Sequence, residues 1–168
     1  MQLVNPSMQY RESWISALAE FDRENRSGFW SLVADPRNLP GLIQRLFEYS
    51  QGINIPEDFV PATTLWGIDK DEYIGHVNIR HRLNENLEKY GGHIGYAVRP
   101  SARGKGYGGQ MLKFSIPFIK QLGLKQVLIT CDKDNIASRK IIEKNGGIYE
   151  NEILDDRGVI KMRYWIDL

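Results

Sequence analysis

Residues 93–112 read HIGYAVRPSARGKGYGGQML, a strand pattern that gives way to a glycine-rich loop and then to a helical pattern. The strand pattern ends at Val98, and Pro100 interrupts it. Because the glycines that follow lack Cβ atoms, the backbone there can approach a ligand closely. The first N–H groups of a helix have no partners within it, and the helix dipole adds partial positive charge. These free N–H groups, together with the positive charges of Arg103 and Lys105, predict a site for an anion such as phosphate.

The spacing of apolar residues predicts further elements on both sides of this stretch. Before it we expect a short strand, two helices and two strands, at 3–4, 8–24, 42–52, 63–68 and 73–83. The stretch itself supplies the strand 93–98. After it we expect a helix, a strand, a helix and two strands, at 106–122, 126–131, 136–145, 148–153 and 159–166. The segment 25–40 carries a glycine and two prolines and is expected to be a loop.

The order of these elements predicts the fold class. Short connections in the first half favour antiparallel neighbours, whereas strand–helix–strand alternation in the second half favours right-handed parallel crossovers. We therefore expect an α/β fold with a mixed, mostly antiparallel central sheet of about six to seven strands, flanked by about four helices. Pro117 falls inside one expected helix and should kink or shorten it.

Composition narrows the protein class. The chain has 168 residues, 42% hydrophobic and 26% charged, which predicts one globular domain over 1–168. The net charge of +1 offers no general attraction for nucleic acid or anionic membrane. No apolar run is long enough to span a bilayer, and the first residues do not resemble a signal peptide. One cysteine excludes zinc sites of the several-cysteine type, and we expect no metal. These features predict a cytoplasmic protein, a monomer or a homodimer.

Other phosphate-binding patterns compete for the glycine-rich loop. A Walker loop is excluded because no Gly-Lys-Ser/Thr closes the pattern. The dinucleotide fingerprint is present at Gly104, Gly106 and Gly109, and Asp132 follows the next strand. That fold places its first glycine directly after the strand and its acid about 20 residues later, so a dinucleotide-binding oxidoreductase is the weaker alternative. A loop that merely turns the chain is another alternative.

Two blocks of sequence resemble a known family. The pattern V-x-P-x-x-R-G-x-G-x-G at 98–108 resembles the acetyl-CoA signature of the GNAT superfamily of N-acetyltransferases, whose core is Arg/Gln-x-x-Gly-x-Gly/Ala. The segments NIAS at 135–138 and EKNG at 143–146 resemble the Asn-x-x-Ala/Ser … Lys-x-Gly helix of that family. The order of expected elements also agrees along nearly the whole chain. The resemblance implies a GNAT-like fold and acetyl-CoA as co-substrate.

The resemblance also implies which residues hold the cofactor. Backbone groups of Tyr96 and Val98 would pair with the pantetheine arm as with an added strand, and N–H groups of 103–109 would hold the pyrophosphate. Asn135 would reach the arm, or would only cap its helix, and Ser138 would lie near the arm, or only on the helix surface. The implied set is Tyr96, Val98, Arg103, Gly104, Lys105, Gly106, Tyr107, Gly108, Gly109, Asn135 and Ser138.

The implied chemistry is direct attack of a neutral amine on the thioester while both substrates are bound. A backbone N–H of Ala97 or Val98 would stabilise the oxyanion. His93 is the candidate base, since a histidine pKa of about 6.5 suits proton removal near neutrality; the alternative is a polar residue at a strand end. Cys131 is expected to be a buried strand residue rather than a nucleophile.

Two positions depart from the family pattern. Ile142 stands where the family often has the tyrosine that protonates the leaving thiolate, and Gly147 replaces its usual phenylalanine. The resemblance therefore leaves the general acid without its usual position. An acyl-CoA-binding module without catalysis is the alternative that this absence supports.

The acceptor is the least defined part. Residues 78–86, NIRHRLNEN, are unusually polar, and the corresponding hairpin lines the acceptor side in the family. Arg80, His81 and Asn84 are therefore predicted to bind the acceptor, with a solvated ribbon as the alternative. We expect an acetyltransferase that acts on a primary amine of a small molecule or peptide.

Overall fold

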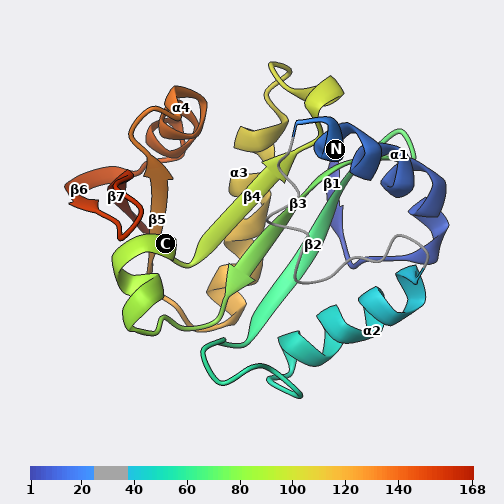
Figure 1. Ribbon diagram of the computed structural model, residues 1–168, viewed down its shortest axis with the longest axis horizontal. Coiled ribbons are helices and arrows are strands. Elements are labelled where there is room, and N and C mark those ends of the chain that lie inside the picture. Colours follow the sequence, from blue (N-terminus) through green and yellow to red (C-terminus); the bar gives the residue numbers. More distant parts are fainter. Residues whose placement is uncertain (25–37) are drawn as a thin grey trace.

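The computed structural model describes residues 1–24 and 38–168 and shows layers of helix and strand (Figure 1). The expected loop at 25–40 lies mostly outside these residues, and its last two residues begin helix α2. The elements are β1 Gln2–Val4, η1 Met8–Tyr10, α1 Arg11–Arg23, α2 Leu39–Ser50, β2 Ala62–Asp69, β3 Glu72–Arg80, η3 Leu87–Gly91, β4 Ile94–Val98, η4 Pro100–Ala102, α3 Tyr107–Gln121, β5 Gln126–Asp132, α4 Ile136–Lys144, β6 Ile148–Leu154 and β7 Ile160–Asp167.

The strands form two antiparallel sheets, with the orders β1-β2-β3-β4 and β5-β7-β6. The α/β class and the mostly antiparallel pairing are confirmed. The parallel relation expected in the second half holds for β5 and β6, which both run antiparallel to β7 and so parallel to each other. Between β4 and β5, however, no ladder forms among the described residues, so the expected central sheet is split there.

Helices cover both faces of the first sheet. In Figure 1, α1 and α2 lie on one side of the sheet and α3 lies behind it. The α1–α2 side buries a cluster that includes Trp14 and Trp66, whose rings stack 5.9 Å apart. The α3 side buries a larger cluster with residues from both sheets, including Leu112, Ile129 and Tyr164. This shared core holds the two sheets together although they do not pair as strands.

Two local features differ from the expectations. Part of the expected β3–β4 connection forms a π-helical turn, η3, which periodicity over so few residues does not reveal. Pro117 does not shorten α3, which runs unbroken from Tyr107 to Gln121. Pro117 and Lys113, whose carbonyl loses its helical partner, both lie on the exposed face, where water can bind that carbonyl. None of the described helices has the length and apolarity that a membrane span requires.

Candidate active site

The free edge of β4 is the first component of the site. Arg99 N–H donates to Ile74 O (2.8 Å) and Arg80 N–H to His93 O (2.8 Å), so odd-numbered residues of β4 pair with β3. In an antiparallel ladder the intervening residues turn their N–H and C=O groups the other way. The backbone groups of Tyr96 and Val98 therefore face the gap toward β5, as the cofactor prediction requires.

The gap is closed at one end by a junction between β5 and the segment that precedes β4. His93 N–H donates to Leu128 O (2.7 Å), and Leu128 N–H donates back to His93 Nδ1 (2.9 Å). Gly92 permits this contact, because its φ is +64° and a Cβ there would lie 2.5 Å from Leu128 O. Beyond the junction β4 and β5 diverge (Figure 1).

The glycine-rich loop forms the wall at the open end. Gly104 and Gly106 have φ values of +76° and +83°, and a Cβ on either would meet nothing within 4 Å. Gly106 is the N-cap of α3 and has no side chain that could accept from the first N–H groups of the helix. Arg103 donates from Nε to Val98 O (3.1 Å) and from Nη1 to Glu24 Oε1 (2.8 Å). The loop thus presents uncapped N–H groups and a guanidinium to the same space.

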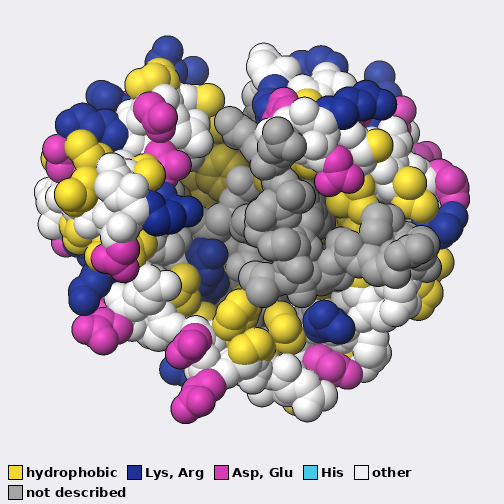
Figure 2. All heavy atoms as spheres, viewed as in Figure 1, with side chains coloured by type: hydrophobic (Ala, Val, Ile, Leu, Met, Phe, Trp, Pro, Cys, Tyr) yellow, Lys and Arg dark blue, Asp and Glu magenta, His cyan; other side chains and the backbone are white. Residues whose placement is uncertain are grey.

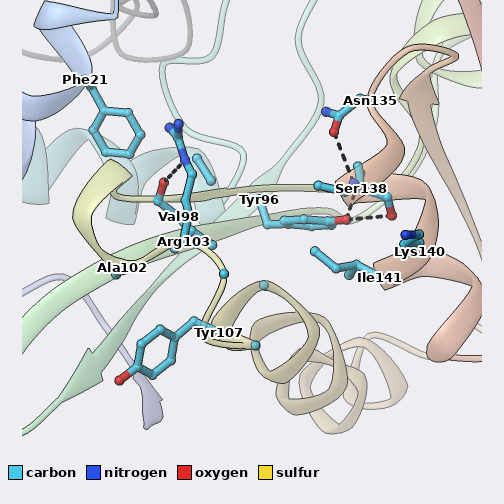
Figure 3. Close-up of a pocket in the computed structure, with 15 residues that line it drawn as sticks. Phe21, Tyr96, Val98, Ala102, Arg103, Tyr107, Asn135, Ser138, Lys140 and Ile141 are labelled. Atoms are coloured by element: carbon cyan, nitrogen blue, oxygen red, sulfur yellow. Dashed lines mark hydrogen bonds between the residues drawn. The ribbon is translucent and has the colours of Figure 1, made fainter.

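Helix α4 forms the opposite wall. The Asn135 side chain accepts from Ser138 N–H (3.1 Å), so the helix-cap role of Asn135 is confirmed, while its role toward a ligand stays a prediction. Ser138 Oγ lies 2.8 Å from the Tyr96 hydroxyl, which joins α4 to β4 (Figure 3). Gly108 lets α3 approach α4, because a Cβ there would lie 2.7 Å from Ile141 Cδ1.

These walls enclose a cavity of about 660 Å³. Figure 2 shows a notch at the top of the molecule, with Lys and Arg side chains on both rims. The predicted residues that line the cavity are Tyr96, Val98, Arg103, Gly104, Gly106, Tyr107, Gly108, Asn135 and Ser138, whereas Lys105 and Gly109 do not. Ala97, named above as an alternative oxyanion donor, also lines the cavity. The lining residues that the sequence did not predict are Phe21, Ala102, Ala137, Lys140 and Ile141. Lys140 could have been found as a cation within the second motif, whereas no sequence signal marks Phe21.

A buried ion pair holds the start of the glycine-rich loop against α1. Arg99, 8% exposed, donates to the Glu20 carboxylate, and it also donates to Tyr73 O (3.2 Å). Glu20 in turn accepts from Ser101 N–H (2.9 Å) and Ser101 Oγ (3.0 Å). Burial raises the pKa of Glu20, but the hydrogen bonds from Arg99 and Ser101 outweigh it and lower the pKa to about 2. The carboxylate is therefore charged throughout the ordinary pH range.

The chain was compared with models of known protein families and with curated protein sequences. A family profile described as an acetyltransferase (GNAT) domain matches residues 17–148. The chain belongs to the GNAT acetyltransferase family. The resemblance found in the two sequence motifs is thereby confirmed, and acetyl-CoA is the co-substrate of that family. No curated protein sequence matches the chain significantly.

Solved structures of acetyltransferases share the fold. The microcin C7 self-immunity acetyltransferase MccE, in complex with acetyl-CoA and AMP, superposes with a TM-score of 0.73 at 19% identity, over 99% of this chain and 91% of that chain. RimL, a ribosomal L7/L12 α-N-protein acetyltransferase bound to coenzyme A, gives 0.72 at 15% identity, over 99% and 93%. A ribosomal-protein-alanine N-acetyltransferase from Brucella melitensis gives 0.69 at 13% identity, over 100% of each chain.

Of the predicted catalytic groups of this GNAT acetyltransferase, the Val98 N–H lies at the cavity and His93 lies at the junction between the sheets. Val98 N–H faces the cavity, whereas Ala97 N–H belongs to the set that faces β3. His93 is buried at the sheet junction, where burial and nearby Arg80 lower its pKa. Because Nδ1 of the neutral ring accepts from Leu128, its proton sits on Nε2 and no lone pair is free. A role for His93 as base stays a prediction and requires that contact to break.

The position of the usual general acid is part of the core. Ile142 is 0% exposed and packs within the cluster shared by the two sheets. Gly147 is equally constrained, because a Cβ there would lie 2.9 Å from Ile142 O and closer still to its side chain. The two departures from the family pattern therefore touch each other.

The residues predicted to bind the acceptor do not line this cavity. Arg80 donates to Gly91 O (3.0 Å) and Gly92 O (2.9 Å), and Asn84 donates to Asp58 O (2.9 Å). His81 Nε2 lies 2.8 Å from Thr63 Oγ1. These contacts give all three side chains a structural role in and beside the β3–β4 connection, and their role in acceptor binding stays a prediction. No group of three or more His, Cys, Asp or Glu within 1–24 and 38–168 could hold a metal ion.

Cys131 is expected to resist alkylation. The thiol is 6% exposed, and burial, with nearby Asp132, raises its pKa to about 11. At pH 8 only about 0.1% of such a thiol is the nucleophilic thiolate. Iodoacetamide at pH 8, followed by mass spectrometry, should leave the folded chain unmodified and modify it fully in guanidinium. Rapid labelling of the folded protein would show that β5 opens or that the thiol is activated.

Proposed function

We propose that this GNAT acetyltransferase transfers the acetyl group of acetyl-CoA to a primary amine of a small molecule or peptide, by direct attack in a ternary complex. The observation that carries the proposal is the unpaired edge of β4, which leads from the uncapped N-terminus of α3 to the closed junction. An extended arm with a pyrophosphate at one end and a reactive group at the other matches that shape.

The cavity residues divide into three tasks. N–H groups of 104–109 bind the pyrophosphate, because that of Arg103 already donates to Pro100 O (3.2 Å). The Arg103 guanidinium, which also pairs with Glu24, and Lys140 on the opposite wall add positive charge to the cavity. Backbone groups of Tyr96 hydrogen-bond the pantetheine arm as a neighbouring strand would, whereas the Val98 C=O already accepts from Arg103 Nε (3.1 Å). Asn135 and Ser138 bound the arm from the side of α4.

The transfer step uses a fixed dipole on the same strand. The amine lone pair attacks the thioester carbonyl, and the carbonyl oxygen gains negative charge. Val98 N–H, which points into the cavity, is the donor we assign to that oxyanion. Strand alternation favours Val98 over Ala97, because the amide of Ala97 is directed at β3.

The acceptor class can be bounded by amine chemistry. Among the structural neighbours, RimL is an α-N-protein acetyltransferase and the Brucella melitensis protein acts on ribosomal-protein alanine. An α-amino group has a pKa of about 7.7–8.0, so a large fraction is neutral near pH 8, whereas a lysine amine at about 10.4 is mostly charged. Peptide N-termini therefore belong beside small-molecule amines in the first set of acceptors to test.

The test measures CoA release from acetyl-CoA with a panel of peptide N-termini, amino acids, polyamines and aminoglycosides. Saturable CoA release that depends on one class of amine, with the acetylated product seen by mass spectrometry, is the expected result. Binding of CoA without turnover of any amine would instead indicate the non-catalytic module. Binding of NAD(H) in place of CoA would indicate the dinucleotide-binding alternative.

A further inference from the structure

The Tyr96 side chain crosses the cavity from one wall to the other. Its hydroxyl lies 2.8 Å from Ser138 Oγ and 3.4 Å from Ser138 O, and Figure 3 shows the ring reaching from β4 to α4. The ring also packs against the core cluster shared by the two sheets, which fixes its direction. Sequence reasoning used only the backbone of this residue, so the hydroxyl has no task in the proposed function.

Of the β4 residues that line the cavity, Tyr96 lies nearest to the closed junction. An arm that starts at the phosphate loop meets Val98 first and must stop before the junction of His93 with Leu128. From Val98 to Ile94 an extended strand rises about 13 Å, at about 3.3 Å per residue. Tyr96 lies midway along this path, two residues from Val98, so its side chain stands beside the part of the cavity where the thioester is proposed to lie.

Helix α4 has no hydroxyl group at position 142, where the family often has a tyrosine. Ile142 lies one turn after Ser138 on α4, and its side chain is wholly buried in the core. Ser138 therefore presents its hydroxyl on the side of α4 that faces β4, and the hydroxyl it contacts comes from β4 itself. The two hydroxyls form one hydrogen-bonded pair across the cavity.

We propose that the Tyr96 hydroxyl, oriented by Ser138, donates a hydrogen bond to the thioester sulfur and stabilises the leaving thiolate. This inference rests on the proposed function and deepens it. In the step concerned, the amine nitrogen forms the N–C bond and the electron pair of the C–S bond passes to sulfur. The amine proton leaves to solvent, while the phenol keeps its proton.

The pKa values of the Tyr96 phenol and of the CoA thiol favour a hydrogen bond between them over transfer of the phenol proton. Burial raises the pKa of Tyr96 to about 12, Ser138 opposes the shift, and the Cys131 thiol on β5 adds to it. A thiol pKa is about 8.5, so transfer of the phenol proton to the thiolate would be uphill by roughly three to four pKa units. A neutral donor aimed at developing charge lowers the barrier without that cost. The activity should then show no loss from a tyrosine ionisation up to about pH 10.

The experiment compares Tyr96→Phe and Ser138→Ala with Tyr164→Phe as the matched control. Tyr164 is also a buried tyrosine, and its hydroxyl lies 3.5 Å from Glu143 Oε1, but it does not line the cavity. Three quantities are measured for each variant: the Kd of CoA by calorimetry, the pKa of the bound CoA thiol from thiolate absorbance, and kcat.

In the wild type we expect the bound thiol to titrate below its value in free CoA. Tyr96→Phe should raise the pKa of the bound thiol by about one unit and lower kcat by roughly 10- to 100-fold, with the Kd of CoA within about threefold. Ser138→Ala should move the thiol pKa and kcat in the same directions by less, and Tyr164→Phe should change neither.

An unchanged thiol pKa and kcat in Tyr96→Phe would overturn the inference, as would a fall in kcat matched by an equal loss of CoA affinity. Should Tyr96→Phe not fold, Ser138→Ala decides by the same two quantities. CoA binding with no wild-type shift of the thiol pKa overturns this inference alone. Absence of CoA binding overturns the proposed function as well.

Discussion

Gly106→Val is expected to raise the Kd of CoA at least 100-fold. Gly106 has a φ of +83°, and its missing Cβ points into open space at the start of α3, where the pyrophosphate is proposed to lie. A valine there blocks the approach of the phosphates to the helix N–H groups and strains the backbone by roughly 1–2 kcal/mol. Calorimetry with CoA gives the Kd, and a 100-fold rise corresponds to about 2.7 kcal/mol.

Gly123→Val is the matched control. Gly123 has a φ of +79° and nothing within 4 Å of its missing Cβ, but it follows the C-terminal end of α3, outside the cavity. Both variants therefore carry the same backbone strain, and only one changes the proposed phosphate site. Equal CoA affinities in the two variants would refute the assignment of the pyrophosphate to this loop.

Glu20→Gln is expected to lower the stability of the fold by about 3 kcal/mol, because it leaves the buried Arg99 guanidinium without its counter-charge. For a chain of this length, that loss corresponds to a fall in Tm of roughly 6–12 °C. The matched control is Glu24→Gln, since the Glu24–Arg103 pair is about one-third exposed and should contribute less than about 1 kcal/mol.

The same pair predicts an acid dependence with a defined sign. The pKa of Glu20 falls from an ordinary 4.5 to about 2 in the folded state, so its contribution is complete above about pH 4.5 and is lost as pH drops toward 2. Urea unfolding at pH 7 and pH 3 should show the difference between wild type and Glu20→Gln shrinking by more than half. A difference that stays constant between the two pH values would show that the charge of Glu20 is not what stabilises the loop.

Much of this architecture could be predicted from local chemistry. The strand, the glycine-rich loop and the following helix are specified by residues close together in the chain, because positive φ at Gly104 and Gly106 and free helix N–H groups are local properties. The roles of Tyr96 and Val98 toward the pantetheine arm were implied by the family resemblance, and the pairing of β4 with β3 turns their backbone groups toward the cavity. Nine of the eleven residues that the resemblance implied for the cofactor line this cavity.

The parts that escaped prediction depend on contacts between distant segments. The gap between β4 and β5 is closed at one end where Gly92 and His93 contact Leu128, and the spacing of residues in the sequence does not predict a contact between positions so far apart. The charge of Arg80 and its place in a polar hairpin suggested that it binds the acceptor, but its side chain donates to backbone carbonyls of the β3–β4 connection. Polarity in a hairpin cannot distinguish a side chain that awaits a ligand from one that is already satisfied by its own backbone.

The gap beside β4 has a consequence for the stability of the folded protein. The first sheet ends at β4, and the backbone groups of Tyr96 and Val98 face a cavity instead of a neighbouring strand. Coenzyme lying there would act as a removable piece of secondary structure that bridges the two sheets, which along this edge are linked by the His93–Leu128 junction and the Tyr96–Ser138 hydrogen bond. Occupancy at 100 times Kd would then add about 2.7 kcal/mol to stability. The persistence of the folded protein would thus follow the supply of its own co-substrate.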